Sequence, residues 1–96
     1  MTLDDTRIRQ RLPHLSGWTL DHTPPSILKD WTFDSFEAAV GFFHRVAELA
    51  SAHDHHPEVW SCHTRLRIRL WTHDAAGLTD KDFALAEAID RIRPSS

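Results

Sequence analysis

The sequence lacks several features by which common classes of protein are recognised. It has a single cysteine, Cys62, so no disulfide can form within the chain and a disulfide-stabilised fold is excluded. It contains no apolar run of about 18 residues, the length that marks a membrane-spanning helix. Its first ten residues, MTLDDTRIRQ, do not have the pattern of a signal peptide. We therefore expect a cytoplasmic protein.

An excess of charge of one sign is also missing. The formal net charge is −3, which creates no field that would attract nucleic acid.

Tyrosine is absent, but four tryptophans, five phenylalanines and a hydrophobic content of 41% supply enough apolar side chains for a packed core. With 96 residues, we expect one domain over residues 1–96 that binds neither nucleic acid nor a membrane. Chains this short often complete their cores by self-association, so an oligomer is expected.

Hydrophobic periodicity predicts the elements of the first third of the chain. Residues 6–15 favour a short helix that ends near Pro13, because proline restricts the backbone of the residue before it. Residues 17–22 and 27–33 carry apolar side chains at period two, as half-buried strands do. The TPPS segment between them is a proline-stiffened connection. These two strands are therefore predicted to form a β-hairpin.

The amphipathic pattern is strongest over residues 34–53, which predicts a helix of about five turns. Asp34 followed by Glu37 has the form of a capping box at its start. The apolar stripe consists of Phe36, Ala39, Val40, Phe43, Val46, Ala47 and Ala50. If Phe43 is fully buried in this stripe, its replacement by alanine should cost about 3 to 5 kcal/mol.

The second half of the chain predicts one or two further strands and a helix. Pro57 disfavours helical geometry at His56 and so marks a helix-to-strand junction. Residues 64–73 alternate strictly, with aliphatic side chains on one face and arginines, Trp71 and His73 on the other. Residues 79–92 form a predicted helix with Thr79 as its N-cap. This order suits an α+β fold in which helices pack on one face of an antiparallel sheet.

The histidines are the side chains most suggestive of function. Three of the eight lie within four residues, at His53, His55 and His56. They admit three interpretations: metal ligands together with His63 and His73, a solvated polar loop, or proton-transfer groups, because imidazole titrates near neutral pH. The residues alone do not separate these interpretations. Asp82 likewise has a simple structural explanation, because a carboxylate in the first turn of a helix favours its positive end.

Several stretches taken together resemble the pterin-4a-carbinolamine dehydratase family. They are HHPE at residues 55–58, THDAAGLTDKD at 72–82, LSGW at 15–18 and WTFDSFEAAVGFFHRVA at 31–47. The resemblance implies a two-layer α+β fold with a four-stranded antiparallel sheet and helices packed on one face, assembled into homodimers or homotetramers. It also implies dehydration of a 4a-hydroxytetrahydropterin to quinonoid dihydropterin and water, in recycling of the pterin spent by aromatic amino acid hydroxylases. The family uses no metal and no organic cofactor, because the pterin is the substrate.

The same resemblance implies roles for individual residues. The catalytic set is His55, His56, His73 and Asp82. By analogy His55 and His73 do the acid and base work, His56 holds the pterin and its hydroxyl group, and Asp82 orients or charges a histidine. The residues expected to contact the substrate are His56, Pro57, Trp60 and Asp82. Replacing His55 by alanine is then expected to remove activity and to leave stability nearly intact.

The sequence departs from the family pattern at three positions. Ser51 stands where the family usually has glutamate, Val59 where it commonly has tryptophan, and His63 where it usually has tyrosine. The serine weakens any claim that a carboxylate tunes the histidine pair. The other two changes alter the expected pterin-stacking surface and the strand pairing, and Trp60 could replace some of the lost aromatic area.

Two alternatives to the enzyme are retained. One is a non-catalytic protein-binding or assembly module of the same fold, because one member of the family doubles as the dimerisation cofactor of a homeodomain transcription factor and related domains help to assemble carboxysomal Rubisco. The other is a histidine-rich metal-binding protein. A scaffold has no need for three imidazoles and Asp82 in this arrangement, and their presence favours the enzyme.

Overall fold

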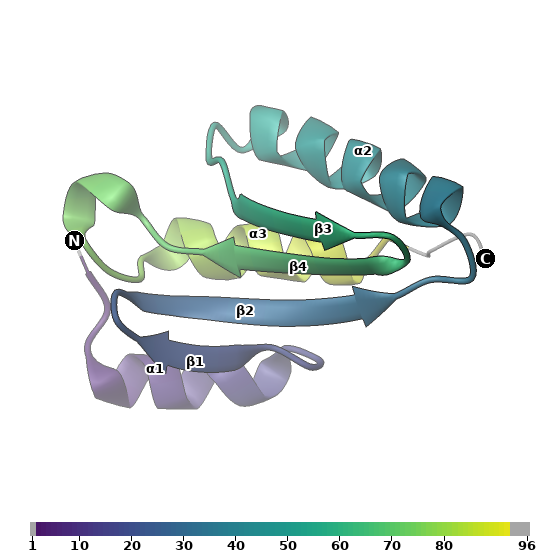
Figure 1. The fold of residues 1–96 in the computed structure, drawn as a ribbon. Coiled ribbons are helices and arrows are strands. Elements are labelled where there is room, and N and C mark those ends of the chain that lie inside the picture. The colour runs from purple at the N-terminus through teal and green to yellow at the C-terminus, as the bar shows by residue number, and fades with distance from the viewer. Residues whose placement is uncertain (1, 93–96) are drawn as a thin grey trace.

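A computed structural model describes residues 2–92 of the chain (Figure 1). Its elements in order are α1 (Asp5–Arg11), the 3-10 helix η1 (Leu12–His14), β1 (Thr19–His22), β2 (Pro25–Thr32), α2 (Phe36–Ala52), β3 (Glu58–Cys62), β4 (Arg65–Leu70), the 3-10 helix η2 (His73–Ala75) and α3 (Asp80–Asp90). The expected domain covered residues 1–96, so its first residue and residues 93–96 lie outside the described part. No helix within residues 2–92 is long and apolar enough to cross a membrane.

The four strands form one antiparallel sheet in the order β1-β2-β4-β3. The central pair is β2 and β4, in a register that places Ile27 opposite Leu70. In Figure 1, α1 and α3 lie behind the sheet, and α2 packs against β4 and α3. The predicted α+β fold with a four-stranded antiparallel sheet is therefore confirmed, and the sequence that follows α2 supplies two strands.

The alternation predicted for β4 is also confirmed. Leu66, Ile68 and Leu70 are at most 2% exposed, whereas Arg65 and Arg67 lie exposed on the other face. The aliphatic face packs against buried side chains of the helices: Phe42, Val46, Phe83, Leu85, Ala86 and Ile89. One face of the sheet therefore carries the core, and the opposite face is open and polar.

The apolar stripe predicted for α2 was right at Ala39, Val46 and Ala50 but wrong at its phenylalanines and at Val40. Its exposed fractions are 50% for Phe36, 46% for Val40 and 38% for Phe43, while Phe42 is 4% exposed. The buried stripe consists of Ala39, Phe42, Val46 and Ala50. The helix carries apolar residues on two adjoining stripes, so periodicity alone could not show which one the sheet covers. The predicted cap also shifts by one residue, because the N-cap is Ser35, whose hydroxyl accepts from the Ala38 N–H group.

The burial of Phe42 and the exposure of Phe43 can be tested by substitution. Replacing Phe42 by leucine should lower the free energy of unfolding by about 1 to 1.5 kcal/mol, because ring atoms are lost from a packed site. The same change at the neighbouring, exposed Phe43 should have a smaller effect. Urea denaturation of both variants at low protein concentration measures the difference. Equal losses in the two variants would contradict the observed orientation of α2.

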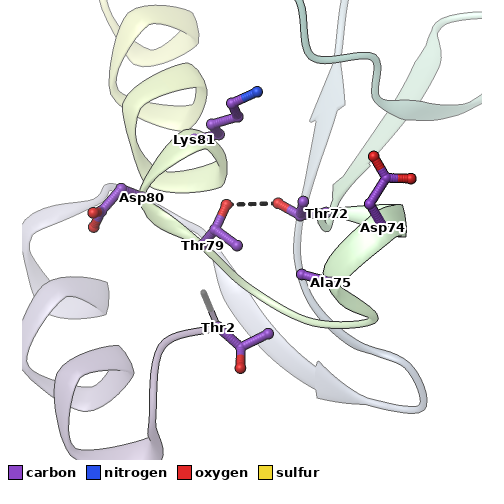
Figure 2. A pocket seen from close by; sticks show the side chains of 7 residues that line it. All are labelled: Thr2, Thr72, Asp74, Ala75, Thr79, Asp80 and Lys81. Atoms are coloured by element: carbon purple, nitrogen blue, oxygen red, sulfur yellow. Dashed lines mark hydrogen bonds between the residues drawn. The ribbon is translucent and has the colours of Figure 1, made fainter.

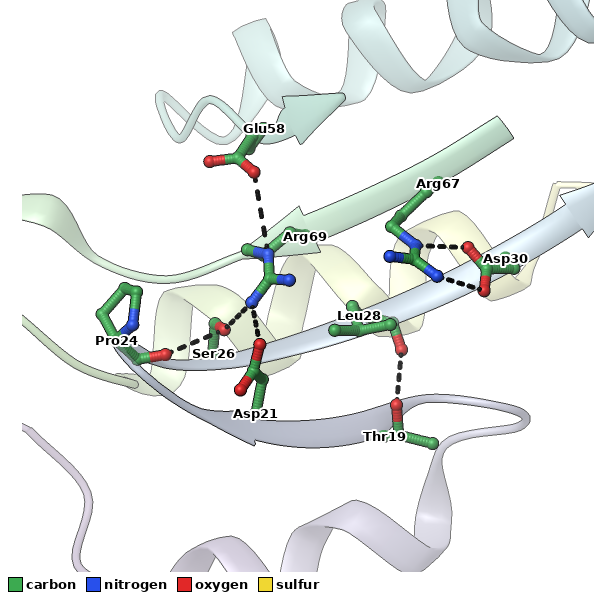
Figure 3. Close-up of polar contacts among 9 residues, drawn as sticks. All are labelled: Thr19, Asp21, Pro24, Ser26, Leu28, Asp30, Glu58, Arg67 and Arg69. Atoms are coloured by element: carbon green, nitrogen blue, oxygen red, sulfur yellow. Dashed lines mark hydrogen bonds and ion pairs between the residues drawn. The ribbon is translucent and has the colours of Figure 1, made fainter. Parts of the chain in front are cut away.

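The open face of the sheet is crossed by ion pairs (Figure 3). Arg67 donates to both carboxylate oxygens of Asp30, at 2.7 and 3.1 Å, and Arg69 donates to Asp21 at 2.6 Å and to Ser26 at 2.9 Å. The hydrogen bond from Arg67 lowers the pKa of the Asp30 carboxyl group below its usual value, and Arg69 lowers the pKa of Asp21 in the same way. These two arginines are therefore balanced by acids, one on the neighbouring strand β2 and one on β1, the next strand beyond it.

Candidate active site

The hairpin of β3 and β4 brings the candidate residues to one end of the sheet. Its antiparallel register pairs Glu58 with Arg69, so the segment before β3 and the segment after β4 leave the sheet at the same end. His55 belongs to the first of these segments and His73 to the second. His63 lies in the turn at the opposite end of the hairpin, with a φ of 54°. The topology therefore separates His63 from the other two histidines.

The end of α2 turns His55 into the protein. His53 is the C-cap and Asp54 adopts a left-handed conformation, with a φ of 50°. The N–H group of Asp54 donates to the carbonyl of Ser51 at 3.1 Å, and that of His55 donates to the carbonyl of Ala50 at 2.9 Å. These two bonds form a Schellman motif, which usually has glycine where Asp54 stands. His55 follows the left-handed residue and turns back toward the helix, so only 7% of its surface is exposed.

His55 meets Asp82 in the interior. The Nε2 atom of His55 lies 2.5 Å from Oδ1 of Asp82, whose exposed fraction is zero. The second carboxylate oxygen, Oδ2, accepts from the Thr72 hydroxyl group and from the Thr79 backbone N–H group, each at 2.9 Å. The Thr72 and Thr79 hydroxyl oxygens are 2.6 Å apart. Every oxygen of this buried carboxylate therefore has a partner, as buried polar groups require.

The sequence suggested two roles for Asp82, one as a carboxylate at the start of a helix and one as the partner of a histidine, and its contacts include both. It is the third residue of α3 and caps the helix through Thr79, and it also holds His55. An ionised carboxylate only accepts hydrogen bonds, so Nε2 of His55 carries the proton and Nδ1 is the nitrogen left for other partners. Asp82 thereby fixes both the orientation and the tautomer of the imidazole.

Thr72 and Thr79 were not among the predicted site residues, although both stand in the THDAAGLTDKD motif. They belong to the lining of a hollow of about 680 Å³, a size typical of small-molecule sites. Figure 2 shows the two threonine side chains pointing toward each other. The lining residues are Thr2, Thr72, Asp74, Ala75, Thr79, Asp80 and Lys81. The hollow thus adjoins the two threonines that hold the Asp82 carboxylate, Thr72 through its hydroxyl group and Thr79 through its backbone N–H group, while the histidines lie outside its lining.

His73 stands next to this network without entering it. It directly follows Thr72 and is the first residue of η2, and its side chain is exposed. The loop is closed by a bridge between Thr72 and Gly77 and turns at Ala76, whose φ is 55°. His73 thus directly follows Thr72 in the chain, and Thr72 donates to the carboxylate that holds His55.

Of the remaining predicted residues, two directly follow His55 and the third lies apart from it on the sheet. His56 is exposed and Pro57 is half-buried, directly after His55. Trp60 is 50% exposed on the open face of the sheet, with its ring 5.8 Å from the Arg65 guanidinium carbon. It lines a separate hollow formed by Asp30, Glu58, Trp60, Arg65, Arg67 and Arg69. Within residues 2–92, no three or more His, Cys, Asp or Glu side chains converge as metal ligands.

Similarity to known proteins extends over nearly the whole chain. The sequence matches the family described as pterin 4 alpha carbinolamine dehydratase over residues 1–92. A protein of Rhodospirillum rubrum is 43% identical over 90 residues, which cover 94% of each chain. A protein of Chloroflexus aurantiacus is 42% identical, over 94% of this chain and 95% of its own. Both are named as pterin-4-alpha-carbinolamine dehydratases, and both names mark the assignment as provisional.

Two solved structures have the same fold. The crystal structure of a transcriptional coactivator/pterin dehydratase from Brucella melitensis superimposes with a TM-score of 0.88 at 29% identity, covering 93% of this chain and 95% of its own. A pterin dehydratase-like protein identified as a RuBisCO assembly factor in the alpha-carboxysome gives a TM-score of 0.69 at 24% identity, with coverages of 86% and 96%. The second likeness concerns the fold alone.

Proposed function

The chain belongs to the pterin-4a-carbinolamine dehydratase family, and on that premise we propose that it converts a 4a-hydroxytetrahydropterin to quinonoid dihydropterin and water. The observation that supports this most is the buried pair of His55 and Asp82, held by Thr72 directly before His73. A protein that only bound partners would not need a buried carboxylate aligned on an imidazole.

The reaction requires two proton transfers. The C4a–oxygen bond breaks as a proton reaches the leaving hydroxyl group, and the ring nitrogen beside C4a loses its proton as the C=N bond forms. We assign these transfers to His55 and His73, with His56 holding the pterin and its hydroxyl group. Positioned acid and base groups of this kind typically contribute about 10²- to 10⁴-fold each. Loss of water leaves the oxidation state of the substrate unchanged, so the proposal includes no cofactor.

Asp82 acts in this proposal through His55. Its carboxylate is completely buried and its oxygens are occupied by His55, Thr72 and Thr79, so contact with the pterin would require the site to open. Pro57 and Trp60 remain the proposed substrate contacts next to His56. Trp60 offers an exposed aromatic face, a surface on which a flat bicyclic ring can stack.

We also propose that the protein works in the cytoplasm as a homodimer or homotetramer, beside a hydroxylase that produces the 4a-hydroxypterin. The exposed stripe of Phe36, Val40 and Phe43 on α2 supports self-association, because contiguous apolar surface of this kind marks interaction sites. Analytical sedimentation of the wild-type protein tests the oligomer.

The proposed activity is tested with enzymatically generated 4a-hydroxytetrahydropterin, whose dehydration is followed by ultraviolet absorbance. We expect the wild-type protein, at catalytic concentration, to accelerate the reaction over buffer. If a folded wild-type protein gives no acceleration, the proposal fails and the non-catalytic binding or assembly module becomes the better reading. That alternative draws support from the Brucella melitensis structure, which is described as a transcriptional coactivator as well as a pterin dehydratase.

A further inference from the structure

The two proposed acid–base histidines are held in different ways. His55 is almost completely buried and its Nε2 atom is bonded to Asp82. His73 is exposed, and within residues 2–92 no group hydrogen-bonds to its ring nitrogens. The one side-chain interaction of its ring in that part of the chain is a stack with Trp71. The orientation of His73 therefore depends on the indole.

The stack follows from the extended backbone after β4. Side chains of an extended chain alternate, so Trp71 and His73 point to one side while Thr72 between them points to the other, toward Asp82. The ring centroids of Trp71 and His73 are 4.2 Å apart, with an angle of 29° between the planes. Trp71 itself is half-buried. The indole thus covers one face of the imidazole and leaves the ring nitrogens at the edge of the stack.

We infer that Trp71 is a positioning residue for the proposed dehydration, which holds His73 in the orientation needed for proton transfer. The inference rests on the proposed function of the same site. An exposed side chain without such a contact changes rotamer on the picosecond to nanosecond timescale. Proton transfer requires a donor–acceptor distance of about 2.6 to 3.2 Å, and a displacement of about 1 Å can cost about 100-fold in rate.

Two variants of Trp71 distinguish the effect of ring stacking on His73 from the effect of apolar side-chain volume. Trp71→Phe keeps an aromatic face against His73, whereas Trp71→Leu keeps apolar volume and removes the stack. We expect the leucine variant to lose about 10- to 100-fold in kcat with a smaller change in KM, because the histidine is misplaced and the substrate site is intact. The phenylalanine variant should recover most of the loss. Thermal melting of each variant checks that it is folded.

Proton NMR of the His73 ring gives a readout that does not depend on activity. In the wild-type protein, the ring current of the indole should shift the His73 ring protons upfield, and the signals are assigned by their absence in His73→Gln. The shift should vanish in Trp71→Leu and persist in part in Trp71→Phe. If Trp71→Leu does not fold, the wild-type shift and the activity of the phenylalanine variant still decide the matter.

The outcomes distinguish this inference from the proposed function. An active wild-type protein whose Trp71→Leu variant keeps full kcat, or whose His73 protons show no upfield shift, overturns the positioning role and leaves the dehydratase proposal standing. An inactive, folded wild-type protein overturns the dehydratase proposal and the catalytic role of Trp71 with it. A shifted His73 signal together with a loss of kcat in Trp71→Leu that phenylalanine restores supports the inference.

Discussion

Replacing Asp82 by alanine should lower the free energy of unfolding by about 3 to 5 kcal/mol and should also remove dehydratase activity. The carboxylate is fully buried and accepts from Thr72 and Thr79 while it holds His55. Its removal leaves several buried donors without an acceptor, and each unsatisfied group costs about 1 to 3 kcal/mol. Urea denaturation measures the loss of stability, and the pterin assay measures the loss of activity.

The matched control for this variant is Asp80→Ala. Asp80 lies in the same first turn of α3, but its side chain is 81% exposed and pairs with Arg11 at the surface. Both changes remove a negative charge from the same helix end, so the effect of the helix dipole largely cancels between them. The urea midpoint should move only slightly in Asp80→Ala, since exposed ion pairs contribute little. A similar midpoint in both variants would show that the buried network adds nothing.

The second large effect is expected at His73. Its replacement by alanine should reduce the catalysed dehydration rate by about 10²- to 10⁴-fold, while the free energy of unfolding should change by no more than about 0.5 kcal/mol because the side chain is exposed. Activity should fall in kcat more than in KM if the imidazole takes part in proton transfer. Stopped-flow absorbance and urea denaturation of the same preparation give both quantities.

His22→Ala serves as the control for that experiment. His22 is exposed at the end of β1, so its loss removes an imidazole of similar exposure from outside the candidate site. This variant should keep the wild-type rate. If His73→Ala also keeps it while the wild-type protein is active, His73 takes no part in the chemistry and the acid–base assignment fails.

His55 should behave differently from His73, and here the structure changes the expectation drawn from sequence. The sequence predicted that replacing His55 by alanine would remove activity and leave stability nearly intact. Its burial and its bond to Asp82 mean that His55→Ala leaves a buried carboxylate oxygen unpaired. The variant should therefore lose about 1 to 3 kcal/mol of stability along with its activity.

Local patterns predicted the elements well and their orientation less well. The alternation in β4 identified its buried face, and Thr79 was recognised as the N-cap of α3. In α2, however, Phe42 and not Phe43 faces the core. Both phenylalanines fit a helical apolar stripe, and only packing against the sheet decides which stripe is covered.

The candidate site shows the same division. The residues of the proposed catalytic set came from the resemblance of two histidine-containing motifs to the family, but three structural features that support them could not be predicted. Asp54 provides the left-handed turn at the end of α2, Thr72 orients Asp82, and Trp71 stacks on His73. Aspartate tolerates a left-handed backbone better than most residues do, which was the one signal available for the first of these features.

The sequence by itself determined the three α-helices, the strands β1, β2 and β4, and the open polar face of β4, because these depend on neighbours a few positions apart. The residues of the proposed chemistry came from the resemblance to the family. Tertiary structure decided which of those residues meet. His55 and Asp82 are 27 positions apart, and they touch because the β3–β4 register, the Schellman turn after α2 and the start of α3 converge at one end of the sheet. Such contacts depend on strand register and packing, which spacing along the chain does not encode.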